Sequence, residues 1–468
     1  MTDLGTRTAP ALRRAAPALL GYAAVRALGL LTLALWSAAR DKSAYTLLTA
    51  RWDALWYTRV AELGYGYEVR LPNGDVHSNL AFFPLLPWLE RLLSAVTPLS
   101  YADAGFAVSL LASLAAAWGV FAVADQVCGR RAGVCAVLLW AVLPVGIVQS
   151  MAYSESLFTA LAAWSLYAVL RGRWVTAGLL ASLAGLTRPV GLAVVAAVWA
   201  AAIAAFVSDR RSRSRTQTPA GPAPLPAHGD PADASHEENP GTTAPSGVPF
   251  ERTRSTVDPS GAHAPEHAPG AGPQPTTGRA PHTNSAPTPP HALTGARSRT
   301  PGTPTRRALG MALSPLGAAA YVLWVGHRTG KGPLGYLDVQ AGWRNGFDGG
   351  YAFARFVGDK FTSFPSALAG VGLIVGVGLV LWLYVVCVRQ GQPLPLLVYA
   401  GVVTALALCA SSYFGSKPRL LMPAFPLMLP LAPALARTRS RRSALIVAVV
   451  AVGSAVYGAF WLNGSGPP

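Results

Sequence analysis

Acidic, aromatic and cationic side chains gather in short polar segments between long apolar runs. The first such segment, 51–87, carries Asp53 among tryptophan and tyrosine residues. Aromatic or apolar residues recur at i+3, i+4 and i+7 from Asp53, which predicts one face of a short helix at the membrane surface. A carboxylate held at that depth can take a proton from a hydroxyl group. A solvated interfacial acid without a catalytic role fits the spacing equally well.

Two more acids and two phenylalanines belong to the same segment. Glu62 and Glu68 flank a Gly-Tyr-Gly-Tyr run, whose glycines permit a turn that would fold these acids back toward Asp53. Surface acids on a loop are the alternative. Phe82 and Phe83 precede a second amphipathic piece and are predicted either to line a groove for a lipid tail or to anchor the loop in the bilayer.

Three later polar segments carry charges at the ends of apolar runs. Glu155 follows Ser154, where an N-cap and an acid in the first helical turn would suffice as an explanation. Arg188 and the pair Lys417 and Arg419 lie in loops expected on the outer side, against the positive-inside trend. Guanidinium groups match phosphate geometry, so these loops predict a phosphate subsite beside the acids. Anchoring to lipid headgroups remains the alternative.

The composition excludes an ordinary soluble protein. Hydrophobic residues make up 52% of the chain and charged residues 13%, about half the usual charged fraction. Many apolar runs have about the length that crosses a hydrocarbon core. The net charge of +17 lies in short loops and one linker, so a membrane explains it better than nucleic acid. The four cysteines form no CxxC pair and are predicted to be small buried hydrophobes.

The apolar runs predict an all-α, polytopic membrane protein with about eleven transmembrane helices and an amphipathic first outer loop. The predicted spans lie near 15–38, 102–125, 132–149, 155–170, 174–187, 190–207, 307–326, 366–388, 394–412, 420–436 and 443–462. A cytoplasmic N-terminus makes each cytoplasmic joint basic, as the positive-inside rule expects.

Three regions follow from this pattern. Residues 1–207 are predicted to form an N-terminal membrane half with the outer loop 40–101, and residues 306–468 a C-terminal membrane half. Between them, residues 208–305 are rich in proline, glycine, serine and threonine, with almost no large apolar residues. Such a segment cannot bury enough apolar surface to offset its ordering entropy, which predicts a disordered cytoplasmic linker. Its scattered histidines have no metal-ligand spacing.

An ordered series of motifs resembles the PIG-V-like mannosyltransferase family, relatives of GPI mannosyltransferase II in the GT-C class of membrane glycosyltransferases. The matching motifs are Trp52-Asp53, the AELGY run 61–65, Glu68, the AFFPLLP run 81–87, the YSESLF run 153–158, the segment 178–191 with its LTRP sequence, and the PRLLMP run 418–423. The chain departs from the family pattern at 69–79 and at the linker, which both look like additions.

The resemblance implies a GT-C-like fold and a glycosyltransferase that moves a sugar, mannose by analogy, from a polyprenyl-phosphate donor to a lipid or glycolipid acceptor on the outer face. It implies that Asp53 is the catalytic base. The residues expected to bind substrates are Trp52, Glu62, Tyr65, Glu68, Phe82, Phe83, Tyr153, Glu155, Arg188, Lys417 and Arg419. No cofactor is expected beyond the lipid-linked donor, no metal ligands are assigned, and a divalent metal remains open.

The expected partners are membrane lipids, the donor and the acceptor, and the expected location is the plasma membrane. The Ala- and Arg-rich composition is typical of a bacterium with a GC-rich genome. A membrane transporter or lipid flippase is the main alternative, and a non-catalytic scaffold is a third. A transporter should carry ionisable groups near the bilayer midplane, whereas the predicted spans contain no Asp, Glu or Lys there.

Overall fold

The computed structural model describes residues 3–216, 304–411 and 413–464. These residues belong to one compact unit, formed by residues 1–216 and 299–468. The remaining unit, Gln217–Ser298, lies outside the described residues. The prediction of a disordered linker therefore falls outside them too, except at the linker's two ends.

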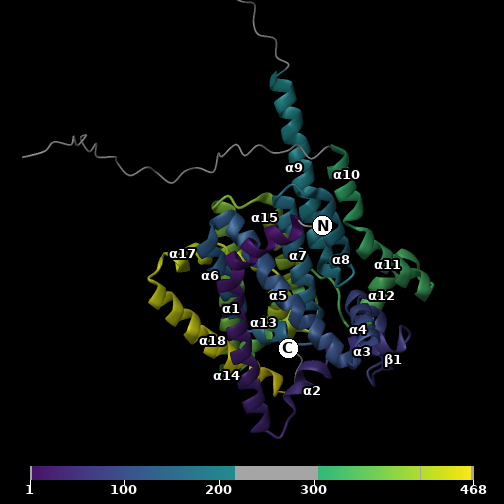
Figure 1. Ribbon diagram of the computed structural model, residues 1–468. Coiled ribbons are helices and arrows are strands. Elements are labelled where there is room, and N and C mark those ends of the chain that lie inside the picture. Colours follow the sequence, from purple (N-terminus) through teal and green to yellow (C-terminus); the bar gives the residue numbers. More distant parts are fainter. Residues whose placement is uncertain (1–2, 217–303, 412, 465–468) are drawn as a thin grey trace, which may run out of the picture. The chain divides into compact units, whose positions relative to one another are not determined.

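Helices make up nearly all of the described structure (Figure 1). Before the linker they are α1 (Asp3–Ala38), α2 (Ala44–Thr49), α3 (Asp53–Leu63), α4 (Leu85–Val96), α5 (Tyr101–Cys128), α6 (Arg130–Ala141), α7 (Ser154–Leu170), α8 (Trp174–Gly185) and α9 (Leu192–Thr216). After it come α10 (Pro304–Leu313), α11 (Leu316–Thr329), α12 (Gly335–Gly342), α13 (Tyr351–Asp359), α14 (Phe364–Arg389), α15 (Leu394–Cys409), α16 (Lys417–Leu421), α17 (Leu431–Arg437) and α18 (Ser440–Leu462).

Short 3-10 helices and two strands complete the structure. The 3-10 helices are η1 (Asn79–Ala81), η2 (Gly146–Ser150), η3 (Pro189–Gly191), η4 (Gly332–Leu334), η5 (Lys360–Thr362), η6 (Phe414–Ser416) and η7 (Phe425–Met428). The strands β1 (Glu68–Arg70) and β2 (Val76–Ser78) pair antiparallel, with Val69 opposite His77.

Within the described residues, six helices are long and apolar enough to cross a membrane, or seven if a bent pair counts as one span. These six include α1, α5, α14 and α18. The bent pair, Phe414–Leu421 with Phe425–Arg437, turns by 72° at the predicted span 420–436. The protein is therefore a helical integral membrane protein, but the predicted count of about eleven spans is not confirmed.

Four of the predicted spans are helical but short. Helix α6 has 12 residues, α7 has 17, α8 has 12 and α15 has 16. Many residues of these helices are buried against neighbouring helices. Short helices and irregular backbone are tolerated at membrane depth where protein covers them, because their polar groups find partners there. Hydropathy alone does not detect this.

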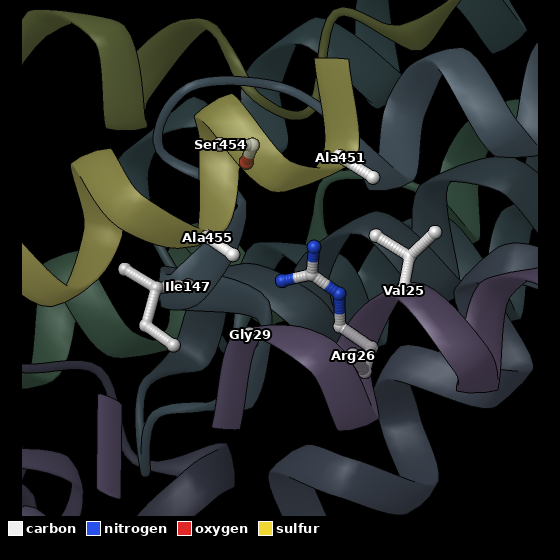
Figure 2. A pocket seen from close by; sticks show the side chains of 7 residues that line it. All are labelled: Val25, Arg26, Gly29, Ile147, Ala451, Ser454 and Ala455. Atoms are coloured by element: carbon white, nitrogen blue, oxygen red, sulfur yellow. The ribbon is translucent and has the colours of Figure 1, made fainter. Parts of the chain in front are cut away.

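A buried arginine supports one such irregular stretch, between α6 and α7. Arg26 of α1 donates hydrogen bonds to the carbonyl oxygens of Ala141 and Gly146, at the end of α6 and the start of η2. Figure 2 shows its guanidinium group lying between α1 and the residues Ala451, Ser454 and Ala455 of α18. The last carbonyls of a helix have no partner within that helix, so this cation stabilises the end of α6.

The first polar segment folds as a helix, a turn, a hairpin and a second helix. Helix α3 confirms the helix expected after Arg51, and Gly64 and Gly66 adopt positive φ angles of 76° and 123° in the turn that follows. The side chain of Asn79 clamps this turn, since its amide donates to the Gly64 carbonyl at 2.9 Å and accepts from the Gly66 amide at 3.0 Å. Figure 1 shows α3, α4 and β1 gathered close to α12.

The two ends of the linker are tied together. Helix α9 continues to Thr216, beyond the predicted start of the linker at 208. Asp209 near its end forms an ion pair with Arg307 of α10. A Cβ on Gly178 would come within 2.4 Å of the Gly310 carbonyl oxygen, so α8 and α10 pack as closely as glycine allows. The helices flanking the linker are thus anchored without it.

Candidate functional site

Two acids and two arginines from distant parts of the sequence meet in one cluster. Nη1 of Arg419 lies 2.9 Å from Oδ2 of Asp53. Nε of the same arginine lies 3.2 Å from Oε1 of Glu155, which also forms an ion pair with Arg188. We refer to Asp53, Glu155, Arg188 and Arg419 as the ion-pair cluster. The structure thereby brings together the predicted base and both predicted phosphate-binding arginines.

Each member of the cluster stands at or near the end of a helix. Asp53 is the first residue of α3, and Trp52 before it has a positive φ of 50°. A positive φ is uncommon for a bulky residue and is often found at functional sites. Glu155 is in the first turn of α7, where the helix dipole favours a carboxylate. Arg188 directly precedes η3.

Burial distinguishes the two acids. The side chain of Glu155 is 1% exposed, whereas that of Asp53 is 24% exposed. One oxygen of Glu155, Oε2, is buried without a hydrogen-bond partner among the described residues. Two cations face two anions in the cluster, so their formal charges balance. Glu155 contacts both arginines from a buried position, and Asp53 is the more accessible of the two acids.

Two tyrosines border the cluster. The guanidinium carbon of Arg419 lies 5.1 Å from the centroid of the Tyr153 ring, a cation–π arrangement. The hydroxyl of Tyr57 lies 2.7 Å from Oγ of Ser154, and both groups are buried. Burial raises the pKa of Tyr57, and the charges of Asp53 and Glu155 raise it while that of Arg188 lowers it. Tyr57 therefore stays protonated at neutral pH.

Glu62 and Glu68 are not part of the cluster, contrary to the expectation that they fold back toward Asp53. Glu62 is exposed near the end of α3. It is nine positions after Asp53, which places it about 13 Å along the axis and on the opposite side of the helix. Glu68 is exposed in β1. In the hairpin Glu68 lies opposite Ser78 of β2.

Phe82, Phe83 and Tyr65 are packed into protein clusters. The ring of Phe82 stacks on Trp56 with centroids 5.6 Å apart, and Phe83 lies 4.4 Å from Tyr321. The hydroxyl of Tyr65 donates to the Phe82 carbonyl at 2.8 Å. Phe82 and Phe83 are 9% and 2% exposed. They support the segment that follows α3 and are not open to a lipid tail, which corrects the groove prediction.

The buried side chain of Lys417 stabilises the end of a helix. Its ammonium group donates to the carbonyl oxygens of Ala407, Leu408 and Ala410 at 2.9, 3.4 and 2.7 Å. These carbonyls end helix α15, and a cation there satisfies groups that have no partner within the helix. The side chain is 3% exposed, so the prediction that Lys417 binds substrate is not supported. Its neighbour Arg419 alone reaches the ion-pair cluster.

The insertion at 69–79 forms a hairpin that docks on the C-terminal half. Asp75 lies 2.6 Å from Nε of Arg344. The ring of His77 stacks on Trp343 at 4.0 Å, and the indole of Trp343 donates to the Ser78 carbonyl at 3.0 Å. A Pro-Asn-Gly-Asp sequence between short runs is the local signal that predicts such a hairpin.

The chemistry available to this arrangement is acid–base and electrostatic. A partly exposed carboxylate that pairs with one guanidinium group, which a buried acid holds beside a second, can accept a proton while the cations stabilise a phosphate. Among the described residues, no group of three or more His, Cys, Asp or Glu side chains is placed to hold a metal ion. The i+4 spacing places Tyr57 on the same helical face as Asp53, but the sequence predicted only an interfacial aromatic there and not a buried neighbour of the cluster.

The fold and the site together define the class of this protein. It is a helical membrane protein that carries a largely buried ion-pair cluster. Residues 31–218 match the family described as Mannosyltransferase (PIG-V), which confirms the resemblance found in the sequence. The GPI alpha-1,6-mannosyltransferase 2 of Rattus norvegicus is 34% identical over 161 residues, or 31% of this chain and 30% of the relative. The Mus musculus protein of the same name is 35% identical over 156 residues, or 31% and 29%.

The matched regions thus span less than a third of these relatives. A solved structure, described as ArnT from Cupriavidus metallidurans bound to undecaprenyl phosphate, aligns with a TM-score of 0.44 and 13% identity. That alignment covers 92% of this chain and 62% of the other. The family match includes Asp53, Glu155 and Arg188, while Arg419 lies outside it.

Proposed function

We propose that this protein is a GT-C-type mannosyltransferase. It takes mannose from a polyprenyl-phosphate donor and transfers it to a lipid or glycolipid acceptor on the outer face of a bacterial plasma membrane. Support comes from the match of residues 31–218 to a mannosyltransferase family and from relatives named for mannose transfer. Because the relatives match over less than a third of their length, the proposal names the acceptor only as a class.

The observation that carries the proposal is the ion-pair cluster, in which the partly exposed Asp53 pairs with Arg419 and the buried Glu155 pairs with both Arg419 and Arg188. In the proposed reaction, an acceptor hydroxyl oxygen attacks the anomeric carbon of the donor sugar. Asp53 accepts the hydroxyl proton, and the bond from the anomeric carbon to the phosphate oxygen breaks. Arg188 and Arg419 stabilise the charge on the leaving polyprenyl phosphate.

Glu155 has a different role in the proposal. Its buried carboxylate holds the two guanidinium groups side by side, which would otherwise repel each other. Because the cluster is already neutral, a phosphate must compete with Asp53 for Arg419. When the donor phosphate binds Arg419, it would therefore displace the Asp53 carboxylate. Asp53 would then be free to act as the base once the donor is in place.

Charged contacts at the opposite ends of the helices support the proposed orientation. The guanidinium of Arg14 pairs with Asp125 at 2.7 Å near the end of α5, and Arg171 donates to Gln126 at 3.3 Å after α7. The ion-pair cluster is at the other end of α7, where that helix begins. Basic ends favour the cytoplasm, which would place the cluster on the outer side.

The test supplies polyprenyl-phosphate-mannose and a nucleotide-mannose in parallel to membranes that lack the synthase of the lipid donor. Transfer from the lipid donor is expected, and Arg188→Ala should abolish it while the protein stays folded. Arg171→Ala is the matched control, since it removes an arginine from the opposite end of the bundle. Transfer from the nucleotide sugar alone would refute the lipid-donor proposal, and normal transfer by Arg188→Ala would refute the phosphate role.

A further inference from the structure

The buried hydroxyl pair of Tyr57 and Ser154 joins the two helices that carry the acids. Their oxygen atoms are 2.7 Å apart, and either group can donate. Tyr57 is 4% exposed and Ser154 is 0% exposed, so no water competes for this bond. Tyr57 is one helical turn beyond Asp53 on α3, and Ser154 directly precedes Glu155 on α7.

Other contacts hold each partner in place without the hydroxyl group. The edge of the Tyr57 ring packs against Phe82 with centroids 5.2 Å apart and planes at 87°. The start of α7 is fixed by Ser109, whose hydroxyl donates to the Tyr153 carbonyl at 3.0 Å, and by Ser156, which donates to the Gln149 carbonyl at 3.1 Å. The hydroxyl pair therefore adds little that the fold requires.

What the pair does fix is the spacing across the ion-pair cluster. Helix α3 packs mainly on α4 and α5, while α7 packs on α5 and α8. The bond from Tyr57 to Ser154 is a direct tether between the helix of Asp53 and the helix of Glu155. Arg419 contacts both acids, so a shift of either helix would change which carboxylate it favours.

We propose that Tyr57 and Ser154 are positioning residues, which set the distance between the Asp53 base and the arginines held by Glu155. This inference rests on the proposed transferase function. A misplacement of about 1 Å at a reacting group can lower the rate about 100-fold. Loss of either hydroxyl is therefore expected to lower kcat about 10- to 100-fold, with little change in the KM for the donor.

The experiment compares Tyr57→Phe, Ser154→Ala and the double variant in donor-saturated mannose transfer, normalised to folded protein. Both single variants remove the same hydrogen bond, so the kcat of the double variant should be no lower than that of the less active single variant. Ser165→Ala is the matched control. It removes another buried hydroxyl of α7, which donates to the Ala177 carbonyl at 2.9 Å, about 16 Å along the helix from Ser154.

The outcomes separate two failures. If the wild-type protein transfers mannose and Tyr57→Phe matches its kcat, the positioning role is wrong while the proposed function stands. Losses that multiply in the double variant, or a loss as large in Ser165→Ala, also overturn the positioning role. If the wild-type protein transfers nothing from the lipid donor, the proposed function fails and the positioning role fails with it.

Discussion

Glu155→Gln should lower stability more than Asp53→Asn does, and Asp53→Asn should lower catalysis more. Both changes keep the side-chain size and remove one negative charge. Glu155 is 1% exposed and faces two guanidinium groups, whereas Asp53 is 24% exposed and faces one. The stability effect should follow burial, and the catalytic effect should follow access to the substrate.

The magnitudes follow from these surroundings. Two unit charges about 4 Å apart interact by about 4 kcal/mol at an effective dielectric constant of about 20. Removing one partner of a buried ion pair costs about 3–5 kcal/mol, because the other charge stays buried without compensation. Glu155→Gln should lower the free energy of unfolding by that amount. Asp53→Asn should lose about 1 kcal/mol or less, because water screens a partly exposed pair.

Catalysis should show the reverse order per folded molecule. Loss of a general base lowers the rate about 10²–10⁴-fold, so Asp53→Asn should be nearly inactive while it remains folded. Thermal unfolding in detergent, followed by tryptophan fluorescence, measures the first effect, and transfer from polyprenyl-phosphate-mannose measures the second. Glu62→Gln is the control, because that exposed acid lies on α3 outside the cluster. Equal stability losses in the two variants, or normal turnover in Asp53→Asn, would refute this reasoning.

Four other results are expected. Asp53→Asn should bind polyprenyl phosphate more tightly than wild type in a fluorescence titration, because Asp53 competes for Arg419; equal or weaker binding would contradict the competition. Lys417→Met should lose about 1–3 kcal/mol of stability from its unpaired carbonyls but keep kcat per folded molecule, and a selective loss of kcat would restore Lys417 to the substrate site. Replacing 217–303 with about 12 glycine and serine residues, which span about 20 Å, should leave melting and transfer unchanged, and an unfolded product would show that the linker is structural. Burial raises the pKa of Glu90, whose oxygens have no hydrogen-bond partner among the described residues. Its contribution to stability is full below about pH 4.3 and is lost as the pH rises through the raised pKa, so Glu90→Gln should melt above wild type by a margin that grows from about pH 5 to about pH 8; a constant margin would contradict the burial argument.

Local sequence patterns account for much of the fold. Apolar runs of bilayer length predicted α1, α5, α14 and α18, because a chain in lipid must satisfy its backbone within helices. Spacing from Asp53 predicted α3, and the glycines predicted the turn after it. Hydropathy could not count the spans, since it does not show how long each helix is, and α6, α7, α8 and α15 have only 12 to 17 residues.

The sequence by itself determined which charged residues needed an explanation. Asp53 stood out because it is an acid among aromatic residues. Arg188 and Arg419 stood out because they are cations on the expected outer side, where a partner or a ligand would explain them. This reasoning used only residue type and local spacing, and it applied equally to Glu62, Glu68 and Lys417.

Only the tertiary structure decided among these candidates. The four cluster residues come from α3, α7, the residue before η3, and α16, and no local pattern encodes their meeting. Lys417 is only two positions before Arg419, yet its ammonium group donates to carbonyls at the end of α15. Charge and spacing along the chain select groups that can react, but the distance between groups far apart in sequence depends on how the helices pack.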